Sequence, residues 1–186
     1  MQFSERLKIS TRDVHAQVEK ELVKYIKNID SKDNYLSLLE LFYGFYAPLN
    51  NLCLVVPMPQ NVEDYTHTHH IELLKDDLTV MGTRNIENFN SNFPEIKNFY
   101  QALGALYVMK GSMLGGKIIS SMIRKRVEGI EDSFFTSGGQ DVQSNWSDFK
   151  TTIDNITHPQ HQEAVIESAM STFNCFGEWI KKYHAN

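Results

Sequence analysis

The sequence is poor in cysteine and proline, and it has no long uninterrupted run of apolar residues. Its two cysteines, Cys53 and Cys175, are too few for a disulfide-rich secreted scaffold or for a zinc site with four cysteine ligands. Both lie in apolar stretches, so we expect buried free thiols. Polar residues interrupt the longest apolar stretches, and the N-terminal residues MQFSERLKIS lack the apolar core of a signal peptide. We therefore expect a cytoplasmic protein that has no contact with a membrane.

Basic residues are also fewer than acidic residues. The chain has 18 lysines and arginines against 23 acidic residues, which gives a formal net charge of -5. Because a nucleic-acid-binding protein needs a basic face, we expect no nucleic-acid partner. The length of 186 residues, with 41% hydrophobic and 22% charged residues, is typical of a soluble globular domain that can bury a core. We expect a single domain that covers residues 1–186.

Strand-like alternation is nearly absent, whereas apolar residues recur every three or four positions. This spacing predicts helices over the following segments: about 4–29, 32–55, 71–80, 94–127, 146–153 and from 158 onward. Ser4 is the expected N-cap of the first helix, Pro48 is expected to kink the second, and Gly82 is expected to close the third. The prediction is an all-α bundle of about six to nine helices with short loops.

The first helix places a histidine at the edge of its buried face. His15 shares this face with residues at helical spacing: Thr11, Val14, Val18 and Leu22. Glu19 lies one turn later, where its carboxylate can accept a hydrogen bond from one imidazole nitrogen and leave the other free to bind a metal. Lys8 and Arg12 precede the histidine on the same side and can reach anionic groups. Taken alone, the segment is equally typical of a half-buried histidine in a helix-stabilising pair, which is the commoner case.

The fourth helix has glycines in its interior, at Gly104, Gly111, Gly115 and Gly116. Each interior glycine costs a helix about 1 kcal/mol relative to alanine, so several of them require a compensating reason. Gly104, Gly111 and Gly115 are spaced by seven and four residues and would form one groove without side chains, against which a flat ligand could lie. The glycines would also allow the helix to bend. Close packing between helices is an alternative of similar weight, and the doubled Gly115–Gly116 favours the groove slightly.

The two segments together resemble haem oxygenases. LKISTRDVHAQVEKEL is similar to the proximal helix of that family, whose Thr-x-x-x-His-x-x-x-Glu pattern falls on Thr11, His15 and Glu19. LGALYVMKGSMLGGKII resembles the distal helix of the bacterial, biliverdin-producing branch, and its Gly-x-x-x-Gly-Gly pattern falls on these residues: Gly111, Gly115 and Gly116. YGFYAPLNNL, LLKDDL and STFNCFGEWI extend the similarity in the same order over nearly the whole chain.

The resemblance implies a fold and a reaction. Haem would lie between the first helix and the glycine-rich helix, with His15 as the iron ligand, Glu19 orienting it, and Lys8 and Arg12 facing the propionates. Haem oxygenases cleave haem with O₂ and electrons from an external donor to biliverdin, carbon monoxide and iron. The expected catalytic residues are Gly111, Ser112 and Gly115. The expected haem-binding residues are Lys8, Thr11, Arg12, His15, Glu19, Tyr107, Gly111, Ser112, Gly115, Gly116 and Phe173.

The implied partner is a ferredoxin, a flavodoxin or a similar reductase, and we expect a monomer or a weak dimer. Ser112 follows the first glycine of the motif, where many animal-type members have aspartate and the bacterial branch commonly has serine. Lys110 stands where that branch usually has glutamate, and Asn50 stands where it often has an acidic residue. These two departures can reflect a changed surface or a lost ion pair between helices, and they bear on regiospecificity and partner contacts more than on haem binding.

Two other functions stay open on the sequence. One is a non-catalytic haem- or tetrapyrrole-binding protein on the same fold, and the other is a helical interaction domain in which the glycines only pack helices. A di-iron centre is not supported, because the sequence lacks Glu-x-x-His pairs on two helices. We interpret two further clusters as solvated segments: His67, His69 and His70 before the third helix, and Arg124, Lys125 and Arg126 at the end of the fourth. The functional alternative for the basic run is a docking site for an acidic electron donor.

Overall fold

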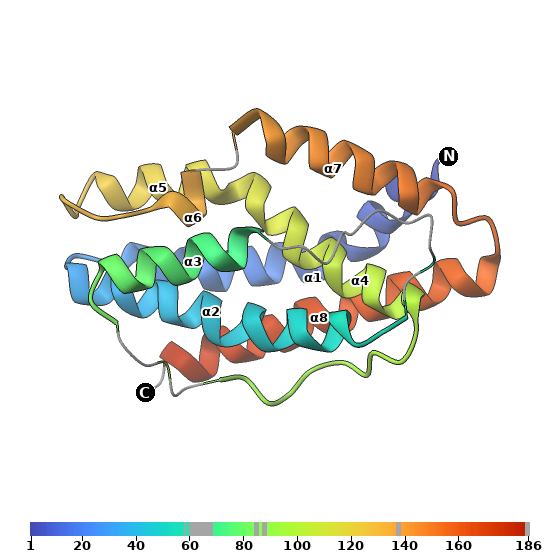
Figure 1. The fold of residues 1–186 in the computed structure, drawn as a ribbon, viewed down its shortest axis with the longest axis horizontal. Coiled ribbons are helices and arrows are strands. Elements are labelled where there is room, and N and C mark those ends of the chain that lie inside the picture. The colour runs from blue at the N-terminus through green and yellow to red at the C-terminus, as the bar shows by residue number, and fades with distance from the viewer. Residues whose placement is uncertain (58, 60–68, 84–85, 87–88, 137–138, 185–186) are drawn as a thin grey trace.

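The structure, a computed structural model, describes residues 1–57, 59, 69–83, 86, 89–136 and 139–184. It confirms the all-α prediction, since the described residues form helices and no strand. The helices are α1 (Phe3–Lys27), α2 (Lys32–Leu54), α3 (His69–Val80), α4 (Phe99–Ser112), the 3₁₀ turn η1 (Met113–Gly115), α5 (Gly116–Arg124), α6 (Ser133–Thr136), α7 (Gly139–Asp154) and α8 (Pro159–His184). In the view of Figure 1, α2 and α8 lie along one side and α7 along the opposite side, with α1, α3 and α4 between them.

Helix α8 supports two other helices at once. It packs against both α1 and α4, more extensively than any other pair of helices in the described part of the chain. Its buried face is apolar apart from small hydroxyl residues and consists of Val165, Ile166, Ser168, Ala169, Thr172, Phe173, Phe176, Trp179 and Ile180. Helix α2 is buried around most of its circumference, as its sequence predicted for a central helix.

Pro48 lies inside α2, and the helix continues past it to Leu54. Proline has no backbone N–H, so the carbonyl of Gly44, four residues earlier, loses its usual helical donor. The backbone N–H of Asn90 donates to that carbonyl instead, at 2.9 Å. The extended segment before α4 therefore attaches to α2 at the position where the proline leaves an acceptor open.

The predicted N-cap at Ser4 is wrong, because α1 begins at Phe3 and Gln2 is the residue at its N-cap. Ser4 lies in the first turn, where backbone N–H groups still lack helical partners. Its N–H and its hydroxyl both donate to the carboxylate of Asp154 at the end of α7, at 2.7 and 3.1 Å. A partner from another helix thus takes the role expected of a local cap. The predicted end of the third helix is confirmed, since Gly82 follows α3 with a φ of 102°.

The long glycine-rich helix is interrupted rather than continuous. Residues Met113–Gly115 form a 3₁₀ turn between α4 and α5, and this break coincides with the two adjacent glycines. Consecutive glycines lower helical stability locally, and a 3₁₀ turn within a helix is a common result. Helix α5 then runs to Arg124, a few residues short of the predicted end.

The glycines of this segment serve two different purposes. A Cβ at Gly104 would collide with α8, at the Val165 carbonyl oxygen and 2.8 Å from the Cβ of Ser168, and a Cβ at Gly116 would collide with the carbonyl oxygen of Phe135. Gly111 meets only the ring of Trp146, at 3.5 Å, and Gly115 meets nothing within 4 Å. The predicted single groove over Gly104, Gly111 and Gly115 is therefore wrong for Gly104, which is a packing glycine.

Gly104→Ala should lower the free energy of unfolding of the ligand-free protein by about 1–3 kcal/mol, because the added methyl group has to displace the backbone of α8. Urea denaturation followed by circular dichroism measures this value. Gly115→Ala is the matched control in the same segment, and it should leave stability unchanged or raise it by up to about 1 kcal/mol. Equal effects of the two substitutions would contradict the division between packing and open glycines.

Candidate active site

A cavity of about 670 Å³ lies between α1 and the segment formed by α4, η1 and α5. Aromatic side chains from α2, α6 and α8 form its inner surface: Phe42, Tyr46, Phe134, Phe135, Phe173 and Phe176. This volume lies within the usual range for small-molecule and cofactor sites, which are mainly apolar with a few polar groups. The two helical segments singled out in the sequence, far apart in the chain, are thus brought to opposite walls of one cavity.

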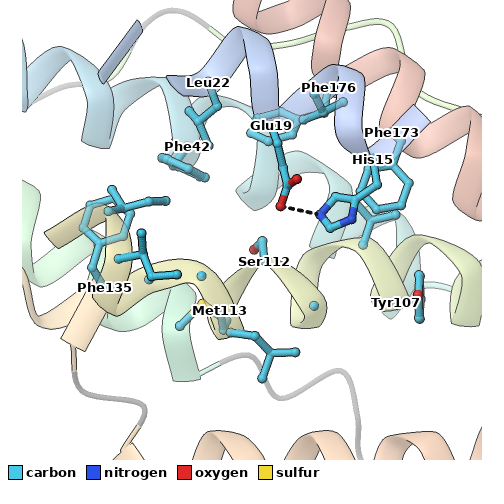
Figure 2. Close-up of a pocket in the computed structure, with 18 of the residues that line it drawn as sticks. His15, Glu19, Leu22, Phe42, Tyr107, Ser112, Met113, Phe135, Phe173 and Phe176 are labelled. Carbon is cyan, nitrogen blue, oxygen red and sulfur yellow. Dashed lines mark ion pairs between the residues drawn. The ribbon is translucent and has the colours of Figure 1, made fainter. Parts of the chain in front are cut away.

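His15 lines the cavity from α1, at the edge of the buried face as predicted. Its Nε2 lies 3.4 Å from the Oε1 of Glu19, a contact longer than a good hydrogen bond (Figure 2). The imidazole packs against the ring of Phe173, with the ring centroids 5.1 Å apart. Its side chain is 51% exposed, so a ligand that enters the cavity can reach it. In this orientation Nε2 faces Glu19 and Nδ1 is the nitrogen left over, so presenting Nε2 to a metal with Nδ1 toward the carboxylate requires a different rotamer of the exposed side chain.

The opposite wall carries Gly111, Ser112 and Gly115 together with Gly116. Ser112 projects from α4 into the space across from His15 in Figure 2. Its hydroxyl donates to the carbonyl of Met109 at 2.7 Å, so the serine proton is already used within its own helix. The wall thus combines bare backbone with one small polar side chain whose oxygen can accept a hydrogen bond.

One end of the cavity holds its cationic groups. Lys8 from α1 and Lys150 from α7 both line it. Tyr107 lines the same cavity, and burial raises the pKa of its phenol while the hydroxyl of Thr11 opposes the shift. The sequence predicted Lys8 and Tyr107 at this site but not Lys150, because nothing in the α7 segment shows locally that one of its lysines lies near α1.

Two of the expected haem-binding residues do not line the cavity. Arg12 points away from it, and its guanidinium contacts Asp13 at 3.3 Å with both side chains mostly exposed. Thr11 is buried beneath the cavity, where its hydroxyl donates to the carbonyl of Leu7 at 2.9 Å. Helical spacing placed both residues on the same side as His15, but a helix face is broader than the strip that borders the cavity.

The other end of the cavity is apolar and is held by a polar network around the buried Asp132. Asp132 accepts hydrogen bonds from the hydroxyl of Ser120 at 2.6 Å and from two nitrogens of the Arg124 guanidinium, both at 2.7 Å. These contacts hold the pKa of the Asp132 carboxyl below its usual value, with the Arg124 hydrogen bond as the main cause and burial opposing it. The network ties α5 to α6, which carries Phe134 and Phe135.

A second carboxylate fixes α6 from the other side. Asp77 of α3 is almost fully buried, and its Oδ2 accepts the backbone N–H of Phe134 at 2.8 Å. Burial raises the pKa of Asp77, and this hydrogen bond opposes the shift. Asp77 and Asp132 therefore position the aromatic end of the cavity without lining it themselves.

Two of the basic residues expected to be solvated, Arg124 and Arg126, instead contact other parts of the protein. Arg124 is not a freely solvated helix end, since it pairs with Asp132, while the guanidinium of Arg126 donates to the backbone carbonyl of Lys27. Lys110 lies over the ring of Phe149, with its ammonium 6.0 Å from the centroid.

The histidine cluster also differs from the expected solvated segment. His67 lies outside the described residues, and His69 is exposed beside Glu72 at 3.4 Å, as expected. His70 is buried in α3, and its Nε2 has no partner among the described protein atoms. Burial lowers the pKa of His70 to about 3, so this residue is uncharged at neutral pH.

The residues present fit a flat molecule that contains a metal and itself supplies most of the atoms that coordinate that metal. The described part of the chain has no group of three or more histidine, cysteine, aspartate or glutamate side chains that could hold a bare metal ion. It offers instead one accessible histidine on an apolar wall, with two lysines at one end of the cavity. Among the described residues, no helix has the length and the apolar character needed to cross a membrane.

Comparisons with known proteins agree with this geometry. The family model described as "Heme oxygenase" matches residues 1–182. The NO- and CO-bound haem oxygenase of Neisseria meningitidis is 18% identical with a TM-score of 0.79, over 100% of this chain and 93% of that chain. The Leptospira interrogans haem oxygenase is 18% identical with a TM-score of 0.73, over 98% of this chain and 100% of that one. Haem oxygenase-1 of the cyanobacterium Synechocystis, in complex with haem, is 13% identical with a TM-score of 0.75, over 100% of this chain and 94% of that chain. A search of curated proteins finds no match.

Asp132→Asn should lower the free energy of unfolding by about 2 kcal/mol at pH 7, because the charged acceptor of the Arg124 and Ser120 hydrogen bonds is lost. The folded-state pKa of Asp132 is depressed, so its stabilisation is present at neutral pH and is lost as the pH falls through that pKa. The difference between the two proteins should therefore shrink below about pH 4. Denaturant titrations from neutral pH down into the strongly acidic range measure it.

Asp13→Asn is the control for that experiment, since Asp13 belongs to an exposed pair and its loss should change stability by less than about 0.5 kcal/mol. A difference between wild type and Asp132→Asn that stays constant over the whole pH range would contradict the assignment to the carboxylate.

Proposed function

Because this chain belongs to the haem oxygenase family, we propose that it binds haem between α1 and the α4–η1–α5 segment and cleaves it to biliverdin, carbon monoxide and iron. One observation carries the proposal: a single apolar cavity has an accessible histidine on one wall and glycine backbone on the other. Taken alone, the His15–Glu19 pair of α1 and the glycines of α4–η1–α5 could each serve only to stabilise or pack helices. Their meeting across one cavity supports a ligand that needs both an axial nitrogen and a flat space.

His15 is the proposed iron ligand, and Glu19 is the proposed second partner of its imidazole. A carboxylate that accepts the N–H of one ring nitrogen fixes the tautomer and leaves the other nitrogen as a neutral ligand. The contact of 3.4 Å is close enough to tighten into a hydrogen bond when the imidazole is oriented by a metal. Phe173 supports the ring from behind, at 5.1 Å between centroids.

Lys8 and Lys150 are the proposed partners of the haem propionates, with Tyr107 beside them. Two cations at one end of an otherwise apolar cavity favour binding with the carboxylates at that end, because carboxylates pair with cations and apolar ring edges with aromatic walls. Lys150 is proposed here in the role that the family resemblance predicted for Arg12. The aromatic end, formed by Phe134 and Phe135, would receive the apolar edge of the macrocycle.

Haem iron, when reduced and supplied with O₂, provides the oxidising chemistry, and a neutral histidine ligand favours O–O cleavage less than a thiolate does. The protein contributes position and environment. Gly111 and Gly115 leave open space above the ligand, since a Cβ at Gly115 would have no atom within 4 Å and a Cβ at Gly111 would meet only the edge of Trp146. Ser112 offers an acceptor oxygen in the same wall, and the aromatic inner surface gives a bound ligand an apolar environment.

The reaction consumes electrons, and the proposed donor is a ferredoxin, a flavodoxin or a similar reductase. The reaction would take place in the cytoplasm, and this chain would be a monomer or a weak dimer. The exposed Lys125 and the half-exposed Arg124 at the end of α5 are available to an acidic protein, although Arg124 shares its charge with Asp132.

His15→Ala should abolish the absorption spectrum of histidine-ligated haem after titration of the purified protein with ferric haem, because the axial nitrogen is removed. Added imidazole should restore much of that spectrum by entering the vacated position. His69→Ala is a matched control, because His69 also pairs with a glutamate on its own helix at 3.4 Å but does not line this cavity. An unchanged spectrum in His15→Ala would show that another residue binds the iron.

Turnover separates an oxygenase from a non-catalytic haem-binding protein. The haem complex, given reduced ferredoxin with its reductase and O₂, should lose its Soret band and gain the broad red absorption of a bilin. The assay should include catalase, which removes peroxide, and an anaerobic sample as the control. Persistence of haem without bilin absorption would contradict the enzymatic proposal and leave haem binding intact.

A further inference from the structure

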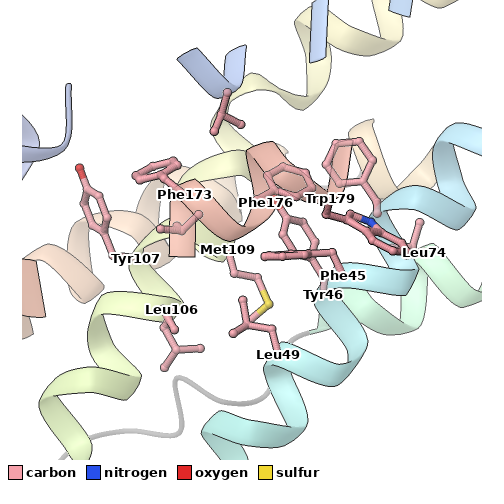
Figure 3. Close-up of a cluster of buried hydrophobic side chains, with 14 of the residues drawn as sticks. Phe45, Tyr46, Leu49, Leu74, Leu106, Tyr107, Met109, Phe173, Phe176 and Trp179 are labelled. Atoms are coloured by element: carbon pink, nitrogen blue, oxygen red, sulfur yellow. The ribbon is translucent and has the colours of Figure 1, made fainter. Parts of the chain in front are cut away.

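Helix α8 carries a row of aromatic side chains that begins at the cavity and ends near the C-terminal end of the helix. Phe173 and Phe176 line the cavity, and Phe173 packs against His15. Trp179 and Tyr183 follow at helical spacing, so all four aromatic side chains lie on one side of α8. Figure 3 shows Phe173, Phe176 and Trp179 in this order along the helix. The row connects the wall that holds the proposed iron ligand with the far end of α8.

Trp179 lies directly behind the aromatic surface of the cavity. It is almost fully buried, and its indole N–H donates to the backbone carbonyl of Leu41 in α2 at 2.9 Å. The next residue of α2, Phe42, lines the cavity and packs against Phe176 with the ring centroids 5.7 Å apart. Trp179 is therefore connected to the cavity wall in two ways: along α8 from Phe176, and across to α2 through its hydrogen bond.

Tyr183 continues the row to the surface. Its ring centroid lies 5.4 Å from that of Trp179, and its side chain is only partly buried. The phenol donates a hydrogen bond to Oε2 of Glu40 at 3.2 Å. Burial and the nearby Glu40 carboxylate raise the pKa of Tyr183, so the phenol is protonated at neutral pH. A phenol that loses one electron also loses its proton, and the Glu40 carboxylate is in place to accept it.

Tyr35 has neither of these two features, although it also lies near the cavity. Its ring centroid is 6.5 Å from that of Phe135, which lines the cavity. However, Tyr35 is completely buried, and its hydroxyl donates to the backbone carbonyl of Glu131 at 2.7 Å. An amide carbonyl does not take up a proton near neutral pH. Tyr183 combines a proton acceptor with contact to solvent, and Tyr35 has neither.

The surface around Tyr183 is rich in cations. Lys181 and Lys182 immediately precede it and are exposed. Lys24 of α1 and Lys181 lie on either side of the single carboxylate of Glu21. An excess of positive charge raises the local concentration of small anions. This end of α8 therefore suits an anionic reductant from solution.

We propose that Trp179 and Tyr183 form an electron-transfer route from the protein surface to the haem cavity, by which the protein reduces hydroperoxides at the expense of an anionic ene-diol reductant. The inference rests on the proposed function, because it needs haem in the cavity as the site at which the hydroperoxide reacts. There the O–O bond breaks, and its two oxygen atoms take up two electrons and two protons to give an alcohol and water.

Each electron leaves Tyr183 through Trp179, while the phenol proton moves to Oε2 of Glu40 and a neutral tyrosyl radical remains. One electron from the reductant then restores the tyrosine, and the proton returns from Glu40. Both electrons thus come from the ene-diol, which is oxidised and releases its protons to water. The two protons consumed at the O–O bond come from water, so the protein is unchanged after each turnover.

The radical on Tyr183 provides the test. The full-length protein is loaded with ferric haem, mixed with ethyl hydroperoxide in the absence of reductant, frozen at once and examined by electron paramagnetic resonance. The wild-type protein should show a tyrosyl radical, and Tyr183→Phe should lose it. Trp179→Phe should lower the yield, because a phenyl ring is much harder to oxidise than an indole. Glu40→Gln should lower it too, since an amide can keep the hydrogen bond but cannot take the proton.

Tyr35→Phe is the matched control and should keep the full radical signal. Haem uptake by every variant is measured first, and circular dichroism confirms that each has folded. A second readout uses ascorbate as the ene-diol. Ascorbate should quench the radical in the wild-type protein, and the rate of hydroperoxide-dependent ascorbate oxidation should fall in Tyr183→Phe but not in Tyr35→Phe.

The outcomes separate this inference from the proposed function. A tyrosyl radical of wild-type size in Tyr183→Phe, after normal haem uptake, would overturn the route and leave the oxygenase proposal standing. An equal loss of signal in Tyr35→Phe would overturn it as well, since the hole would then not be confined to α8. Failure of the wild-type protein to bind haem would overturn the proposed function itself.

Discussion

The cavity keeps its width because helix backbones approach closely at Gly104 and Gly116. Gly104 lets α4 lie directly on the backbone of α8, and Gly116 lets α5 lie on the carbonyl of Phe135. Because α8 also carries α1, the distance between α4 and α8 sets the distance between the two cavity walls. A side chain at either position would push one wall away from its support. Packing and the cavity wall therefore use the same helical segment: Gly104 only packs, Gly111 and Gly115 border the cavity, and Gly116 does both.

The cavity is chemically divided along its length. Lys8 and Lys150 occupy one end, whereas aromatic rings fill the other. Asp77 and Asp132 lie behind the aromatic end, where they fix α6 through a backbone N–H and through Arg124. Such a division favours one direction of entry for a ligand that has carboxylates on one edge.

Much of the architecture could be predicted because it depends on short-range spacing. Apolar residues every three or four positions predicted most helices, and the distance of four residues between His15 and Glu19 predicted their contact, which the structure shows at 3.4 Å. The expected N-cap at Ser4 was wrong because its partner, Asp154, is 150 residues away. The expected place of Gly104 in the open groove was also wrong, because the atoms beside it belong to α8. In both cases a long-range contact replaced the local one.

Local spacing was enough to establish the helices, the face of α1 that carries His15, and the positions at which backbone is left bare. These features follow from the geometry of one helix, which any sufficiently long segment obeys. Two outcomes required the packed molecule: which glycines pack and which stay open, and that Lys150 rather than Arg12 borders the cavity. They depend on which helix covers which face, and spacing within a segment contains no information about the segment that will pack against it.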